Sequence, residues 1–387
     1  MTVKKGSLFI IFMTVFIDLI GFGIIIPLLP FYAQKFGASV IEIGFLMTSF
    51  SLLQFLLSPM WGKISDHVGR RPILLLGLFG SALSYIIFAL APTLQWILIS
   101  RCIAGICGAT ISTSFAYISD ITTAENRTKG MGIVGAAFGL GFIFGPALTG
   151  VFAGHSETLP LYIASGICFA NFLLALIRLP ESLAEKKTEK LKLSHWLPLN
   201  NLWHLIKIPR VPALYAIYFL TIFAFSMMES TFALMGQKLY GFNVQTISYL
   251  FVYIGVVLAV MQGGLIGRLS KKFGEKKSML AGQLALAIGV GLLPFSPNLG
   301  IFIGVNTLVA MGFGMNNPSV SSTVSKVAPD KEKGFVLGGV QSMGSLGRIL
   351  GPVAGTIVFQ QFAVSAPFTL GATVLAITLL LTLFFVP

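Results

Sequence analysis

Charged residues are scarce in this chain: Asp, Glu, Lys and Arg make up 10% of its 387 residues, whereas soluble globular proteins carry about a quarter. Hydrophobic residues make up 55%, and the mean hydropathy is +0.89. This composition excludes an ordinary cytosolic enzyme. It also excludes a disordered chain, which needs low hydrophobicity and high charge. The three cysteines lie in apolar runs, so they predict small packing side chains rather than a disulfide framework.

Motifs for covalent catalysis are missing as well. The sequence has no nucleophile elbow, no His or Cys spacing typical of a metal site and no P-loop, and its four histidines fall in loops. We therefore expect no enzymatic activity, no bound metal and no organic cofactor. The missing P-loop also argues against direct use of ATP.

Long apolar runs dominate the chain instead. A membrane-spanning helix needs roughly 20 to 25 apolar residues, and these runs are too long for barrel strands and lack a two-residue alternation. The first run has no signal-peptide cleavage site after it, so we expect it to remain in the membrane. The sequence predicts an all-α integral membrane protein with twelve transmembrane helices, at roughly 8–30, 41–61, 72–91, 95–118, 130–153, 160–179, 211–236, 245–267, 277–295, 298–324, 335–360 and 366–386.

The basic residues predict an orientation. The even-numbered loops and the N-terminus together hold 22 of the 26 Lys and Arg residues, whereas the opposite loops hold Lys35 and Lys238. By the positive-inside rule the first side is cytoplasmic. We expect a multi-pass protein of the inner or plasma membrane with both termini cytoplasmic. The same bias explains the net charge of +13 without any nucleic-acid partner.

The chain contains an internal repeat. The segment GKISDHVGRR, which begins at Gly62, recurs 205 positions later as GRLSKKFGEK, and the Gly-Pro pair at Gly145 recurs 206 positions later at Gly351. We predict two six-helix bundles, residues 1–180 and 211–387, in the same orientation. The charged segment 181–210 between them is predicted to be a cytoplasmic linker that contains an amphipathic surface helix at 195–208.

Two parallel halves of this kind are the arrangement of major facilitator transporters, which bind substrate near the bilayer midplane between the halves. The loop from Gly62 to Arg71 resembles that superfamily's G-x-x-x-D-x-x-G-R-[RK] signature, and R-x-x-x-G at Arg101 resembles its fourth-helix motif. The first span, around Asp18, and the glycines of the fifth span resemble the twelve-span drug:proton antiporters, such as the tetracycline-efflux and NorA-type pumps. The resemblance covers the whole chain.

The signature loop implies a cytoplasmic gate. Asp66 can lie near a helix N-terminus, where free N–H groups favour a carboxylate, and the arginines can pair with Asp120 or Glu125. Such a charge network closes one face of a bundle and opens during transport; plain orienting charge is the alternative. In the second half Lys271 and Glu275 replace Asp66 and Arg70, so its copy is expected to be altered or weak. The gate candidates are Gly62, Asp66, Gly69, Arg70, Arg71 and Asp120.

Small residues recur along the fifth span, in the pattern that the resemblance identifies as the antiporter motif. Glycines four residues apart allow two helices to approach closely, and a Gly-Pro pair loosens the helix because proline removes an N–H. A packing face alone is the alternative to a conformational role. The candidates are Gly135, Gly139, Gly145, Pro146 and Gly150, and the eleventh span repeats the pattern.

Four ionisable residues remain within the spans: Asp18, Arg101, Glu229 and Arg348. A charge at that depth costs several kcal/mol, so each is a candidate for proton coupling or substrate binding. Glu229 has no cation near it in the sequence, and burial favours its neutral form, which suits a site that loads and releases a proton. It also resembles the seventh-helix acid of NorA-type pumps. A protonated packing residue is the alternative, and Asp18 is the rival proton carrier unless it bonds to Arg101.

The chain departs from the NorA-type pattern at two places. Those pumps have a neutral residue where this chain has Arg348, and an acid on the tenth helix, where this chain has Asn316 and Asn317. Losing an acid and gaining a cation disfavours strongly cationic drugs and favours neutral, zwitterionic or anionic amphiphiles. Flexible apolar side chains and neutral amides are the expected pocket lining, although any one of them alone is more often packing. These candidates are Phe225, Met227, Met228, Phe232, Asn316, Asn317 and Gln341.

The resemblance implies a secondary active transporter. It would act as a monomer and export hydrophobic or amphiphilic, tetracycline-like small molecules by alternating access, driven by the proton gradient, with protons and membrane lipid as its other partners. A flippase or exporter of an endogenous lipid or metabolite is an alternative. A transporter-like receptor or scaffold is a more remote one.

Overall fold

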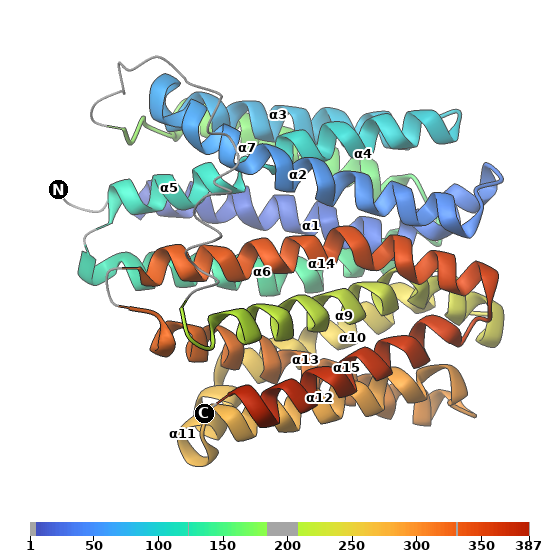
Figure 1. The fold of residues 1–387 in the computed structure, drawn as a ribbon. Helices are drawn as coiled ribbons and strands as arrows, with labels where there is room; N and C mark the ends of the chain where they lie inside the picture. Colours follow the sequence, from blue (N-terminus) through green and yellow to red (C-terminus); the bar gives the residue numbers. More distant parts are fainter. Residues whose placement is uncertain (1–4, 123, 184–207, 330–331, 387) are drawn as a thin grey trace. The chain divides into compact units, whose positions relative to one another are not determined.

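The computed structural model describes residues 5–122, 124–183, 208–329 and 332–386, with the side chains of 5–8, 124–135 and 138 left aside. Within these residues the chain forms helices and short turns without strands (Figure 1). The all-α fold class is therefore confirmed. The amphipathic helix predicted at 195–208 falls almost entirely outside the described residues.

The first half of the described chain contains seven helices that follow the predicted spans. These are α1 (Lys5–Lys35), α2 (Val40–Val68), α3 (Arg70–Ala89), α4 (Leu94–Gly108), α5 (Ile111–Ile121), α6 (Ala124–Phe152) and α7 (Leu159–Arg178). The fourth predicted span corresponds to α4 and α5 together, because the helix is interrupted by the turn at Ala109 and Thr110.

The second half repeats this order. Its helices are α9 (Val211–Tyr240), α10 (Val244–Val260), the π-helix η2 (Met261–Leu265), α11 (Ile266–Phe273), α12 (Glu275–Leu292), the 3₁₀ helix η3 (Leu293–Phe295), α13 (Leu299–Val327), α14 (Lys333–Gln361) and α15 (Ala366–Phe385). In the described part of the chain, ten helical segments are long and apolar enough to cross a membrane, and α6 adds the apolar stretch Gly139–Phe152.

Contacts divide the chain into two compact units. Unit 1 comprises Met1–Ala38, Ser49–Leu197 and Val244–Val252, and unit 2 comprises Ser39–Thr48, Pro198–Asn243 and Tyr253–Pro387. In unit 1, α1 packs along α6 and α7, and α3 packs along α4 and α7. In unit 2, α9 packs along α14 and α15, and α12 packs along α13 and α15. The two units thus use the same pairs of helices in the same order.

The backbone carries the repeat at single residues. The glycines with positive φ in the described chain form two pairs, Gly37 (76°) with Gly241 (67°) and Gly69 (117°) with Gly274 (84°). The members of each pair are 204 or 205 positions apart in the sequence. A side chain with a Cβ rarely adopts these angles. The same tight turns therefore end α1 and α9, and the same turns begin α3 and α12.

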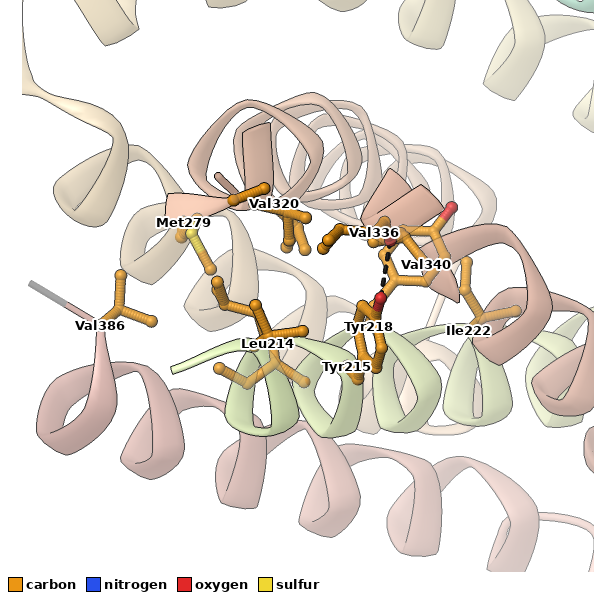
Figure 2. Close-up of a cluster of buried hydrophobic side chains, with 13 residues drawn as sticks. Leu214, Tyr215, Tyr218, Ile222, Met279, Val320, Val336, Val340 and Val386 are labelled. Atoms are coloured by element: carbon orange, nitrogen blue, oxygen red, sulfur yellow. Dashed lines mark hydrogen bonds between the residues drawn. The ribbon is translucent and has the colours of Figure 1, made fainter. Parts of the chain in front are cut away.

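Each unit has an apolar core. In unit 2 a buried cluster brings together side chains of α9, α12, α13 and α14 with Val386, which follows α15 (Figure 2). The Tyr215 hydroxyl donates to the Val336 carbonyl oxygen at 2.7 Å inside this cluster. Unit 1 has a corresponding cluster made by α1, α3, α5, α6 and α7. These cores hold the ends of α3 and α12 where the charged loops lie.

Candidate functional site

A charge network occupies the end of unit 1 where α2 finishes and α3 begins. Arg70, the first residue of α3, is buried with 7% of its surface exposed. Its Nη1 lies 2.6 Å from an Asp66 carboxylate oxygen, and its Nε donates to Asp120 at 3.1 Å. The Ser65 hydroxyl and the Gly62 carbonyl oxygen accept from Nη1 at 2.5 and 3.4 Å. One guanidinium therefore joins the ends of α2, α3 and α5.

The carboxylate at the N-terminus of α3 belongs to Glu181, which the sequence analysis missed. Its two carboxylate oxygens accept from the backbone N–H groups of Arg70 and Arg71 at 2.8 and 3.2 Å. Asp66 was expected to lie near a helix N-terminus, but it sits in the last turn of α2 and faces the Arg70 side chain instead. Ser182 adds a hydroxyl bond to Asp120 at 3.0 Å.

Gly69 makes room for this carboxylate. It has φ 117°, and a Cβ at this position would collide with a Glu181 carboxylate oxygen. The signature glycine is therefore required here both by its backbone angle and by the space that the Glu181 carboxylate occupies. Arg71 points elsewhere: its Nη2 donates to the Leu176 carbonyl oxygen at 2.6 Å, near the end of α7. The Glu125 side chain, the other expected partner of the arginines, is outside the described side chains.

Unit 2 has the corresponding ion pair with its signs exchanged. Glu275, the first residue of α12, pairs with Lys326 in the last turn of α13 at 2.9 Å and accepts from the Ser322 hydroxyl. Arg70 and Glu275 are 205 positions apart, and Asp120 and Lys326 are 206 apart. The side chain of Lys326 is 70% exposed, so this pair is held far less rigidly than the buried Arg70.

The antiporter motif forms a close seam between α6 and α1. A Cβ on Gly145 would lie 2.5 Å from the Ile20 carbonyl oxygen and 2.7 Å from the Gly23 Cα. Pro146 lies inside α6, 2.9 Å from the position of a Cβ on Gly23. Gly150 faces Tyr249 of α10, within unit 1, whereas Gly139 has no atom within 4 Å of its Cβ position. Gly135 lies in α6. The close contact with α1 therefore involves only part of the predicted antiporter motif.

Unit 2 repeats the seam between α14 and α9. Four glycines of α14 face α9. A Cβ on Gly344 would meet Tyr218, and one on Gly347 would meet Ile222 and Phe223. A Cβ on Gly351 would meet Ser226 and Met227, and one on Gly355 would meet Met227. Because residue numbers increase together on the two helices, α9 and α14 run parallel. The contacts also fix which turn of α14 lies beside which turn of α9.

Asp18 and Arg101 lie in unit 1 without a direct ion pair between them in the described structure. Asp18 accepts from the Ser81 hydroxyl at 3.2 Å. Arg101 is 2% exposed, its guanidinium lies 5.1 Å from the Phe88 ring centroid, and its Nε and Nη2 find no hydrogen-bond partner. Tyr85 of α3 interacts electrostatically with both Asp18 and Arg101. A tyrosine hydroxyl thus lies within the electrostatic reach of the two charged groups.

Glu229 and Arg348 occur together in unit 2. Both side chains are half-buried, and the Arg348 guanidinium lies near enough to attract the Glu229 carboxylate and to act on Tyr218. Among the described residues the two side chains do not form an ion pair. Arg348 donates to the Ser345 hydroxyl at 3.4 Å. The sequence offered no cation for Glu229, because its neighbour lies on a helix more than a hundred residues away.

The pocket candidates separate into two groups. Met227, Met228 and Phe232 are at most 2% exposed, and Phe232 packs on Phe302 with ring centroids 5.8 Å apart. Asn316 is also buried and donates to Thr221 at 3.4 Å. Phe225, Asn317 and Gln341 keep exposed surface. The first group is therefore packed inside unit 2, and the second group keeps accessible surface.

Glu181 is the functional residue that sequence reasoning missed. Its position in the chain, directly after Pro180 at the end of α7, is separated from Arg70 by 111 residues. The segment around it had the composition of a solvated linker, which gave no reason to single out one carboxylate. A usable signal was that the basic start of α3 needs a carboxylate partner for its free N–H groups.

The helices, the repeated charged loops and the mid-helix ionisable residues define a membrane transporter built from two related units. A family model described as Major Facilitator Superfamily matches residues 11–265 and 247–387. The chain therefore belongs to the Major Facilitator Superfamily. It is a multi-pass membrane transporter of small molecules rather than an enzyme, as the sequence predicted.

Individual relatives place it near drug-resistance proteins. The tetracycline resistance protein of class C from Escherichia coli is 30% identical over 363 residues, which cover 93% of this chain and 91% of that protein. Multidrug resistance protein 2 from Bacillus subtilis (strain 168) is 31% identical over 387 residues, covering 98% and 95%. The crystal structure of the human organic anion transporter MFSD10 (TETRAN) superposes with a TM-score of 0.74 at 25% identity, covering 99% of this chain and 100% of that one.

Proposed function

We propose that this transporter exports hydrophobic or amphiphilic small molecules in exchange for protons, by alternating access. The names of its relatives support drug efflux, since one is a tetracycline resistance protein and another a multidrug resistance protein. The human relative is named an organic anion transporter. A cation at Arg348 agrees with that name, so the substrates of this chain need not be cationic.

Glu229 carries the proposal of proton coupling. A carboxyl group in the middle of a transmembrane helix is costly to keep charged and is favoured where it binds a proton or an ion. Glu229 lies 18 residues into the 30-residue helix α9, and it is half-buried with no hydrogen bond in the described structure. Protonation on one side of the membrane and release on the other would couple its charge to substrate movement.

The Arg70 network supports a gate at the expected cytoplasmic end. Its bonds join three helix ends through one buried guanidinium, so any motion that separates these ends must break charge-assisted hydrogen bonds together. We further propose that the protein acts as a monomer in the inner or plasma membrane with both termini cytoplasmic. Residues 181–210 would link two six-helix bundles formed by 1–180 and 211–387.

Proteoliposomes with an imposed pH gradient test the coupling. The wild-type protein should accumulate tetracycline against its gradient when protons flow the opposite way. Glu229→Gln mimics a permanently protonated group, so it should abolish gradient-driven accumulation while leaving some downhill exchange. Asp18→Asn is the comparison variant.

Two results would contradict this assignment. Full accumulation by Glu229→Gln together with loss in Asp18→Asn would move the proton site to α1. If neither change alters transport, proton exchange itself is rejected, and a carrier of an endogenous lipid or metabolite becomes the better explanation.

A further inference from the structure

Glu229 lies on the face of α9 between two packed stripes. Thr221 and Phe225 face α13, where they contact Asn316 and Phe313. Ser226 and the residues one turn before it face the glycines of α14. Glu229 comes four residues after Phe225 and three after Ser226, so at 100° per residue its side chain falls between the two stripes. It therefore borders both α13 and α14 without taking part in either helix contact.

Arg348 has the equivalent position on α14. Gly344, Gly347 and Gly351 face α9. Another stripe faces the part of α2 that belongs to unit 2: Thr48 donates to the Ile349 carbonyl oxygen at 2.9 Å, and a Cβ on Gly44 would meet Thr356. Arg348 follows Gly344 by four residues and lies between these stripes. A guanidinium has five N–H donors, and the Ser345 hydroxyl takes one of them.

The seam contacts give the spacing between the two charges. Gly347 lies beside Ile222 and Phe223, so Arg348, the next residue of α14, lies level with the residue that follows them on α9. Because the helices are parallel, this level is about five to six residues before Glu229, or about 8 Å at 1.5 Å per residue. The two charges are close enough to attract each other, and a ligand group that carries two charges of its own fits between them. Among the described residues, the helices packed against α9 add few other charges: α15 has none, α13 has Lys326 in its last turn and α14 has Lys333 in its first turn.

Apolar and neutral polar groups adjoin the pair. Phe225 and Phe313 stack with centroids 3.8 Å apart, and both keep exposed surface. Asn317, one turn beyond Phe313, has a buried side-chain oxygen with no hydrogen-bond partner. An amide oxygen in that state accepts readily from an N–H donor.

We propose that the Glu229–Arg348 pair selects zwitterionic amphiphiles. An anionic oxygen group of the substrate binds the Arg348 guanidinium, and its ammonium group binds Glu229 and the free Asn317 oxygen. Its apolar part rests against Phe225 and Phe313. This inference rests on the proposed export function and names the substrate class of the same site.

The two charges also determine the sense of coupling. An ammonium group beside Glu229 competes with the proton for one carboxylate, so substrate and proton exclude each other, as exchange requires. A purely anionic substrate on Arg348 would instead favour protonation of Glu229, and by linkage the proton would favour the substrate. Such binding suits transport of both in one direction. A zwitterion engages both charges and still competes with the proton.

One scaffold in four charge forms tests the proposal: Nε-dansyl-lysine, its methyl ester, its Nα-acetyl derivative and the doubly blocked neutral compound. Equilibrium binding to the purified full chain is measured by dansyl fluorescence. The wild type should bind the zwitterion at least ten-fold more tightly than the singly charged forms, since charge-assisted hydrogen bonds contribute about ten-fold to a hundred-fold each. Arg348→Gln should shift the preference to the cationic ester. Glu229→Gln should shift it to the anionic acetyl form.

Arg268→Gln is the matched control, because it removes one exposed positive charge from unit 2 at α11 and should leave the ranking unchanged. The proposal is overturned if the wild type binds the neutral form best, if it fails to bind the zwitterion, or if both variants weaken all four forms equally. The ranking needs no gradient. Loss of gradient-driven export with an intact ranking would therefore reject the proposed function alone, whereas gradient-driven export without the ranking would reject only the zwitterion class.

Discussion

A single arginine organises the charged end of unit 1. Arg70 is almost fully buried and has partners on the ends of α2 and α5. A planar guanidinium can bond several acceptors at once, which a lysine ammonium on a flexible stem does less well. The bonds are strong because the group is charged and sheltered from water. Arg70 therefore behaves as a connector among helix ends.

Asp66→Asn should slow transport much more than it weakens substrate binding. The substitution keeps the shape of the side chain but removes the charge that faces Arg70 at 2.6 Å, so the network loses one of its two carboxylate partners. Initial transport rates and equilibrium substrate affinity measured on the same preparation separate the two effects. Wild-type flux at matched protein levels would rule out a gating role for Asp66.

At the level of elements, the two charged ends differ in how they fit the helix dipoles. A negative charge is favoured at a helix N-terminus and a positive charge near a C-terminus. Glu275 at the start of α12 and Lys326 in the last turn of α13 follow this rule. Arg70 at the start of α3 and Asp120 near the end of α5 oppose it. Glu181 supplies the negative charge that the start of α3 otherwise lacks.

At the position that corresponds to Glu181, unit 2 has an apolar residue instead of a third charged partner. The position 205 residues after Glu181 is Val386, which is buried in the apolar cluster of unit 2 (Figure 2). The exchange of the charges between the two ion pairs and the replacement of the Glu181 carboxylate by valine therefore have the same physical reason. Once the charge at the start of α12 agrees with its dipole, the residue after α15 is free to join the core.

Glu181→Gln should destabilise the protein by about 1 kcal/mol, because it removes the charge that caps α3 while it retains an amide oxygen. Ser182→Ala is the control, since that side chain bonds to Asp120 and leaves the α3 amides alone. Thermal unfolding of both variants in detergent measures the difference. Equal melting temperatures for Glu181→Gln and the wild type would show that the cap contributes nothing.

The helix seams are the second feature at this scale. At Gly145 the α6 backbone touches the α1 backbone, whereas Gly139, six residues earlier on the same helix, faces open space. Adding a methyl group to a well-packed contact forces the backbone to move, at a cost of about 1–3 kcal/mol. In an open helical position alanine is better than glycine.

Gly145→Ala should therefore lower both the melting temperature and the transport rate, and Gly139→Ala should preserve or slightly raise the melting temperature. The pair is matched because both substitutions add one methyl group to the same helix. If the two variants unfold at the same temperature, the seam at Gly145 is not a close contact in the membrane.

For the whole molecule, the sequence predicted the fold class and the helix positions because membrane burial imposes long apolar runs that can be read locally. The repeat could also be predicted, because Gly69 and Gly274 both have positive φ and the sequence keeps a glycine at each position. Contacts between distant helices could not be predicted from the sequence. The proximity of Glu229 to Arg348 depends on the register of α9 against α14, and the contact of Glu181 with Arg70 depends on how α7 packs along α3.

Topology is the remaining expectation at this scale. In a variant without the three native cysteines, a cysteine at Ser156, between α6 and α7, should react with a membrane-impermeant maleimide in intact cells. A cysteine at Thr188 should react only after the membrane is permeabilised. The asymmetry of basic residues is the physical reason. Labelling of the Thr188 variant from outside would reverse the proposed orientation.

The glycine seams also constrain how this transporter can evolve. Gly145, Gly351 and Gly355 have backbone atoms or short side chains against them, so almost every mutation there reduces the amount of folded protein before it can alter specificity. Phe225, Asn317 and Gln341 retain free surface and have no such restriction. Under selection by a new toxic compound, adaptive changes should accumulate at these three positions, while sequences recovered from the same population keep the seam glycines unchanged.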